Sequence, residues 1–220
     1  MSTVTEGRYP GEFLLSEANF HRSRDNAVVA VSQTIKPGTL LAKKAVVADV
    51  VATASADAGN TASSGTIAMD ATAVTSAVKD GRYIGVATAA TKVEWEDPTG
   101  KPIGVSTHGA LFNKGGIRLT ITAGGTPNVA GDRFYVDVAA NSEDFQFVAF
   151  NQDGTDGSEI ASAIALYGIT TPADATGKIA IIARDAEVVA ACLEWPADIE
   201  AAEKADAIQS LAEAGILVRA

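Results

Sequence analysis

The stretch that decides the fold is C-terminal, residues 193–218, with the sequence LEWPADIEAAEKADAIQSLAEAGILV. It predicts a helix after the Trp-Pro pair, because Asp198 can accept amide hydrogens of the first turn and Glu200 suits the positive end of the helix dipole. Gly215 suits a left-handed C-terminal cap, and a last strand follows at 216–218. The predicted apolar face consists of Ile208, Leu211 and Ala212, with Ala205 beside them.

Working outward, most of the chain alternates between apolar and polar residues in short runs separated by turns. Residues 117–122 alternate cleanly, which is typical of a strand with one buried face. A second, short helix is predicted at 187–195. The sequence therefore predicts an α+β fold, mainly β, with one confident C-terminal helix. Strands are predicted at 27–31, 39–42, 83–87, 92–96, 117–122, 133–138, 145–150, 161–168 and 177–183.

Two segments interrupt this pattern. Residues 53–66 hold no large apolar residue, so they predict a boundary or a long surface loop. Residues 67–138, with turns about every ten residues, predict a small sandwich or barrel. The first ~26 residues show no regular period and predict either a frayed terminus or an arm that orders on a partner, since the apolar cluster at 13–15 would otherwise be exposed.

Charge and composition exclude several classes of function. The chain has 17 basic and 27 acidic residues, a net charge of −10, which disfavours binding to nucleic acid and to anionic membranes. The single cysteine cannot form an internal disulfide. No signal peptide or membrane-spanning run is visible, so we expect a soluble protein made in the cytoplasm.

Candidate catalytic and metal-binding patterns are weak. Ser106 and His108 lack the spacing of a nucleophile elbow. Cys192 lies among apolar residues and near acidic ones, which predicts a small packing residue. We therefore predict no catalytic, cofactor or metal site and no enzyme. Residues 151–159 resemble a calcium loop only superficially, because Asp156 stands at the sixth position where an EF-hand has glycine. The carboxylates of this loop are predicted to form a turn, with a loosely bound cation as the alternative, and they are Asp153, Asp156 and Glu159.

Several blocks of the sequence, in this order, resemble the tailed-phage, lambda-type head decoration family. The last two, with a helix between them, are also similar to the shorter lambda member. The blocks are GEFLLSEAN (11–19), SRD (23–25), QTIKPGTLL (33–41), FVAF (147–150), DG (156–157), ALYG (165–168), ARDAEV (183–188), LEWP (193–196) and AGILVR (214–219).

This resemblance implies a structural protein of the virion, made in the bacterial host cytoplasm. It implies a homotrimer on the outer surface of the expanded capsid, at three-fold sites. There the trimer would bind the major capsid protein and link neighbouring capsomers against DNA pressure. The resemblance implies a flexible capsid-binding arm at 1–25 and a decoration-protein core at 26–45 and 145–220. Residues 46–144 depart from the lambda pattern, and we interpret them as an inserted β-rich domain.

The resemblance also implies site residues. The alternating apolar residues of the arm can add a strand to a capsid edge. Trp195 and Pro196 are either a core Trp with a helix-starting Pro or part of a trimer interface. The residues predicted for the arm are Gly11, Glu12, Phe13, Leu14, Leu15 and Ser16.

Two other classes of function stay open from the residues. A phage accessory module could bind host-surface glycan through residues 46–144, with Trp95, Tyr83 and Tyr135 as a sugar-stacking face, although each ring could equally pack in a core. A hydrolase is the remaining alternative. Neither needs nucleic acid or a membrane as partner.

Overall fold

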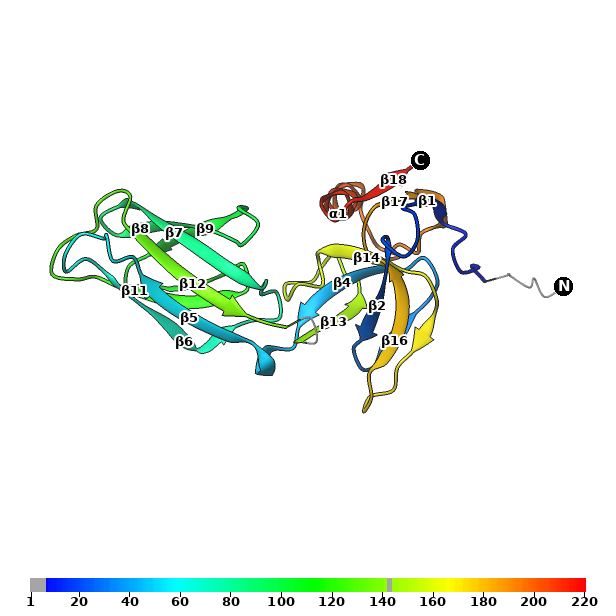
Figure 1. Cartoon of the computed structure of the whole chain (residues 1–220), viewed down its shortest axis with the longest axis horizontal. Coiled ribbons are helices and arrows are strands. Elements are labelled where there is room, and N and C mark those ends of the chain that lie inside the picture. The colour runs from blue at the N-terminus through cyan, green and yellow to red at the C-terminus, as the bar shows by residue number, and fades with distance from the viewer. Residues whose placement is uncertain (1–6, 142–143) are drawn as a thin grey trace. The chain divides into compact units, whose positions relative to one another are not determined.

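A computed structural model of the chain describes residues 7–141 and 144–220 (Figure 1). Strands dominate the described part, and its one α-helix, α1 (Ala201–Glu213), lies near the C-terminus, which confirms the predicted mainly β fold class. The chain divides into two compact units. Unit 1 comprises Met1–Lys44 and Phe145–Ala220, and unit 2 comprises Ala45–Asp144.

Five strands of unit 1 close a small barrel. Inward-facing aliphatic residues such as Val29, Leu41 and Ile181 form its core. β13 runs parallel to β2, whereas β2 and β14 are both antiparallel to β16. In spatial order the strands are β13 (Phe145–Ala149), β2 (Arg24–Val29), β16 (Gly177–Ile182), β14 (Ala161–Ala165) and β4 (Leu40–Ala45).

A three-stranded sheet and α1 complete unit 1 (Figure 1). Ala207 and Leu211, one helical turn apart, are the buried residues of α1 and pack in one cluster with Val188 and Ile216. The sheet order is β1 (Leu14–Glu17), β17 (Ala186–Val189) and β18 (Ile216–Arg219). The smaller elements are β3 (Thr34–Ile35), paired with β15 (Ile169–Thr170), and the 3-10 helix η3 (Ala190–Cys192).

The C-terminal prediction is confirmed in outline and corrected in detail. Gly215 has φ +81°, as a left-handed cap requires. The helix starts later than expected, with Glu200 rather than Asp198 at the N-cap, where the Glu203 carboxylate accepts the Glu200 amide at 2.8 Å. Ala205 and Ala212 are exposed instead of core-facing. The second helix, predicted at 187–195, is wrong, because these residues pair as β17 and then form η3.

Unit 2 contains two antiparallel sheets that share a core. The Trp95 ring of one sheet stacks on the Phe112 ring of the other, with centroids 6.0 Å apart, which is the sandwich form of the prediction. The 3-10 helix η1 (Val47–Asp49) precedes the sheets. One sheet has the order β5 (Val51–Ala56), β12 (Arg133–Ala139), β7 (Gly81–Ala89), β8 (Lys92–Glu96), β9 (Pro102–Thr107), and the other β10 (Leu111–Lys114), β11 (Ile117–Thr122), β6 (Thr66–Val74).

The loop predicted at 53–66 is shorter than expected. Residues 53–56 belong to β5, a terminal strand that pairs in register with β12. A terminal strand with small side chains needs little apolar content, because backbone hydrogen bonds to its one neighbour hold it. Composition alone could not distinguish this strand from a loop.

Candidate functional site

An N-terminal segment, residues 8–17, docks on unit 1. The Val189 amide donates to the Phe13 carbonyl at 2.8 Å, and β1 then pairs with β17. The Phe13 side chain is fully buried in one cluster with Leu40 and Leu211. The expectation that Phe13 would be exposed without a partner is therefore wrong. Residues 1–6 of the predicted arm lie outside the described residues.

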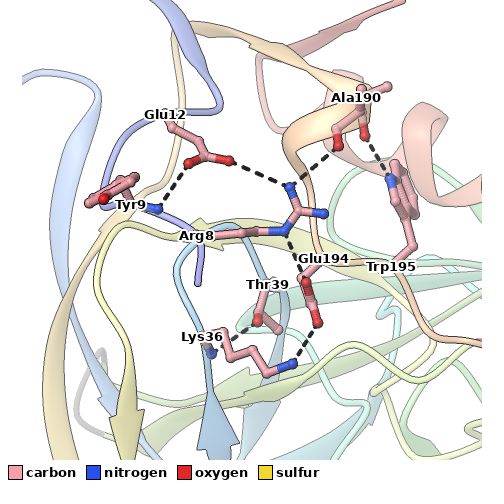
Figure 2. A network of polar contacts seen from close by, with 9 residues as sticks. Arg8, Tyr9, Glu12, Lys36, Thr39, Ala190, Glu194 and Trp195 are labelled. Atoms are coloured by element: carbon pink, nitrogen blue, oxygen red, sulfur yellow. Dashed lines mark hydrogen bonds and ion pairs between the residues drawn. The ribbon is translucent and has the colours of Figure 1, made fainter. Parts of the chain in front are cut away.

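Ion pairs hold the start of this segment beside the Trp195 region (Figure 2). Arg8 Nε donates to Glu194 Oε2 at 3.0 Å, and Lys36 Nζ donates to Glu194 Oε1 at 2.8 Å. Arg8 Nη1 also reaches the Ala191 carbonyl at 3.3 Å. The Lys36 and Arg8 donors lower the pKa of Glu194, so its carboxylate stays charged and bridges two distant parts of the chain. Sequence analysis missed this network.

Gly38 allows these segments to approach closely. It has φ +81°, and a Cβ atom there would lie 2.8 Å from the Cys192 carbonyl oxygen and 3.6 Å from the Phe13 ring. The Glu194 amide donates to the Gly38 carbonyl at 2.9 Å. Because any side chain at Gly38 would collide with backbone, the Lys-Pro-Gly turn at 36–38 also serves to seat the Trp195 region.

Trp195 and Pro196 line a hollow of about 190 Å³ on unit 1, together with Lys36 and Phe150. The Trp195 indole is half-buried. Its Nε1 donates to the Ala190 carbonyl at 2.9 Å, and Lys204 Nζ lies 4.5 Å from the ring centroid. The ring is thus held in place by the chain itself while the hollow beside it stays open.

The outward side of the N-terminal segment carries apolar side chains. Tyr9 is 57% exposed and Leu15 is 56% exposed. Leu15 sits at an irregularity in the β1–β17 register, and the next residue, Ser16, donates from Oγ to Glu187 at 3.1 Å. Of the predicted arm residues, Phe13 faces the core and Leu15 faces solvent. This division gives a fixed segment with one exposed side.

In unit 2 the proposed sugar-stacking face does not form from Trp95 and Tyr83. Both rings are fully buried, so neither can stack on a sugar. Trp95 Nε1 donates to Ser106 Oγ at 3.0 Å inside the core. Tyr135 keeps part of its ring exposed, but the Arg82 guanidinium covers it at 4.9 Å.

The weak catalytic pattern is not assembled. Ser106 is buried, and its hydroxyl accepts from Trp95 and donates to the Val93 carbonyl at 3.3 Å. His108 instead contacts Asn128, with Nε2 3.1 Å from the Asn128 amide nitrogen. Ser106 and His108 therefore serve separate structural contacts.

The carboxylates of the 151–159 loop make local contacts. Asp156 pairs with Lys44 and accepts from Ser158 Oγ at 2.7 Å, and Glu159 accepts the Gly157 amide at 2.8 Å. Among residues 7–141 and 144–220, no group of three His, Cys, Asp or Glu side chains is placed to hold a metal ion. Within the same ranges, no helix has the length and apolar character to cross a bilayer.

The described part of the chain is thus a β-rich protein in which β1 pairs with β17 and Trp195 lines a hollow. Residues 3–216 match the family described as bacteriophage lambda head decoration protein D. Since the match covers nearly the whole chain, the chain belongs to this family. It is a phage head decoration protein, a structural protein associated with the outer surface of the virion capsid.

Other comparisons add little. No curated protein matches the chain. Two crystal structures of FlgL from Xanthomonas campestris are similar at 22% and 24% identity over 51% and 47% of this chain, each with a TM-score of 0.32. The aligned part covers only 34% and 32% of those FlgL chains. A likeness at this TM-score carries no argument about function.

Proposed function

We propose that three copies of this protein bind the outer surface of the expanded capsid at three-fold positions and link neighbouring capsomers against the pressure of packaged DNA. Family membership supports the capsid as the partner. The observation that carries the proposal is β1, which is the terminal strand of its sheet and presents the exposed Leu15. No catalytic residue is required for this task.

A terminal strand keeps one row of backbone donors and acceptors for a further strand. We therefore propose that a strand of the major capsid protein pairs with the outer side of β1. Main-chain hydrogen bonds would supply affinity and Leu15 would supply register. This refines the arm model, because β1 is already paired with β17 on its other side.

Trp195 and Pro196 are proposed to face a neighbouring copy across the hollow that they line. Aromatic residues are enriched at such interfaces. Three linked capsid contacts in one trimer can raise the overall affinity by ~10²–10⁴ without any new type of contact. Weak single contacts would then suffice to stabilise the shell by mass action.

The test is cosedimentation of purified protein with expanded empty capsids. Deleting residues 1–20 would remove Phe13 from the core, so a surface substitution is sharper. Leu15→Lys should weaken binding at least about tenfold, the scale of a lost interface contact. Val51→Lys, at a valine 64% exposed in unit 2, should bind normally. Equal binding by Leu15→Lys would contradict the β1 contact.

The domain assignment is part of the proposal, with 1–25 as the arm, 26–45 and 145–220 as the decoration core and 46–144 as the insert. Replacing 46–144 with a short Gly-Ser linker should leave capsid binding intact.

Imaging of decorated capsids should place density at the three-fold positions, and its absence there would contradict the trimer model.

A further inference from the structure

We infer that Phe20 is a preformed anchor that inserts into an apolar pocket of the capsid subunit. This inference rests on the proposed function. Phe20 lies in the loop between β1 and β2 and is 92% exposed, the largest exposure among the large apolar side chains described. A fully exposed phenylalanine has no role in holding the fold together.

The backbone at Phe20 is strained. Its φ is +64°, in the left-handed region that bulky residues rarely adopt. Such conformations persist where the surrounding structure fixes them, and they occur at sites of function more often than elsewhere. Glycine or asparagine would adopt this conformation more easily. The phenylalanine therefore carries a conformational penalty with no compensating contact in the described part of the molecule.

The loop is nevertheless rigidly held at its base. Ser23 is fully buried, and its hydroxyl accepts the Ala18 amide at 2.9 Å and donates to the Asp185 carbonyl at 2.7 Å. The Ala183 amide donates to the Ser23 carbonyl at 2.8 Å. With its base fixed on both sides, the loop holds the Phe20 backbone in place. An aromatic side chain has only two torsion angles to order, so its entropy cost on binding is low, as an interface anchor requires.

The charges around the loop are already neutralised. Each of the three arginines near it forms an ion pair within unit 1, so the loop presents an apolar ring with no unpaired arginine beside it. A neutral, apolar pocket is the complementary partner, and this contact should depend little on salt. The pairs are Arg22–Asp185 at 3.3 Å, Arg24–Glu17 at 2.7 Å and Arg184–Asp25 at 2.9 Å.

The capsid subunit is the occupant because Phe20 continues the proposed capsid contact. Only two residues separate it from the end of β1, and Tyr9, Leu15 and Phe20 put three exposed large apolar side chains within one short N-terminal stretch. The decoration family places this protein on a capsid surface. A capsid strand beside β1 would bring the capsid subunit next to the loop.

The experiment compares Phe20→Gly, Phe20→Asn and wild type for thermal stability and for affinity to expanded empty capsids at two salt concentrations. Both substitutions suit a positive φ, so the melting temperature should be unchanged or higher. The affinity should fall about 30-fold, the scale of a hot-spot residue, at both salt concentrations. Val129→Ala, at a valine 57% exposed in unit 2, is the matched control and should bind normally.

If both variants bind capsids as tightly as the wild type, the role of Phe20 as an anchor is overturned and the proposed function still stands. Failure of the wild-type protein to bind capsids would overturn both. A change in self-association of the free variants, measured by analytical ultracentrifugation, would show that the ring faces a second copy and would overturn the capsid assignment. A lower melting temperature in both variants would show a structural role and would also overturn it.

Discussion

The two units of this protein are stabilised in different ways. Unit 2 is built around large aromatic side chains whose polar atoms have partners inside the sandwich, such as the Tyr83 hydroxyl, which donates to the Gly115 carbonyl at 2.9 Å. Unit 1 is built mainly from aliphatic residues, with Phe13 and Phe150 among them, and is closed by segments far apart in sequence, with residues 8–17 beside 186–194. Unit 1 therefore depends on its N-terminal segment for folding.

The largest expected effect tests this dependence. Phe13→Ala should destabilise unit 1 by about 3–5 kcal/mol, because it empties a fully buried site where the N-terminal segment meets the core. The chain has two tryptophans, Trp95 in unit 2 and Trp195 in unit 1. Denaturant titrations followed by Trp195 fluorescence in a Trp95→Phe background should show the loss.

In a Trp195→Phe background, Trp95 fluorescence should show that Phe13→Ala leaves the stability of unit 2 unchanged. The mirror variant is Phe134→Ala, which removes a fully buried ring from unit 2 and should affect Trp95 alone. If both reporters shift together in either variant, the two units unfold as one and the comparison fails.

The contrast also explains which parts of the fold could be predicted. Local alternation predicted residues 117–122 correctly, because one buried face fixes a period of two within the strand itself. Residues 187–195 were mispredicted because β17 is fixed by β1 and β18, which lie elsewhere in the sequence. Burial of Phe13 depends on the same distant strands, so no local pattern could indicate it.

The candidate site shows the same limit. Family resemblance drew attention to Trp195 and Pro196, and they line a hollow. The Arg8–Glu194–Lys36 network joins residues up to 186 positions apart and could not be inferred from their spacing. The strain at Phe20 was also invisible, because φ is a property of the folded loop and phenylalanine gives no signal for it.

A second prediction concerns the buried carboxylate of unit 2. Asp97 Oδ1 accepts the Thr99 and Lys101 amides at 2.9 and 3.0 Å, while Lys79 Nζ donates to Oδ2 at 2.6 Å. Asp97→Ala leaves these donors without an acceptor and should destabilise unit 2 by about 1–3 kcal/mol. Asp97→Asn, which keeps an acceptor oxygen, should lose less. If thermal unfolding shows the same loss of stability in both variants, the loss comes from the missing charge and not from the missing acceptor oxygen.

The third prediction separates the units by pH. Burial lowers the pKa of His108 below its usual value near 6.5, and the Gly65 amide orients Asn128 so that His108 Nε2 accepts a hydrogen bond. Below pH 6.5 the unfolded chain binds a proton more readily than unit 2 does. The contribution of neutral His108 to the stability of unit 2 is therefore complete above pH 6.5 and is lost as the pH falls below that value.

In unit 1 the Lys44 and Ser158 hydrogen bonds lower the pKa of Asp156 from 3.8 to about 2, so the contribution of Asp156 to the stability of unit 1 is lost only between those two pH values.

Between pH 6.5 and 5, Trp95 fluorescence should therefore show that the stability of unit 2 falls, and His108→Gln should remove this fall. Trp195 fluorescence should show little change in the stability of unit 1 over the same range. A pH dependence that persists in His108→Gln would assign the effect to other groups.

The smallest expected effect lies at the surface of unit 1. Arg8 and Glu194 each keep about a third of the side chain exposed, so Arg8→Ala should reduce stability by only about 0.2–1 kcal/mol, and less at high salt. Its local effect should be larger, because Arg8 also binds the Ala191 carbonyl beside Trp195. Hydrogen exchange should rise at residues 9–12 while β1 stays protected by β17. If protection of β1 is lost as well, the ion pairs rather than the Phe13 contact hold the N-terminal segment in place.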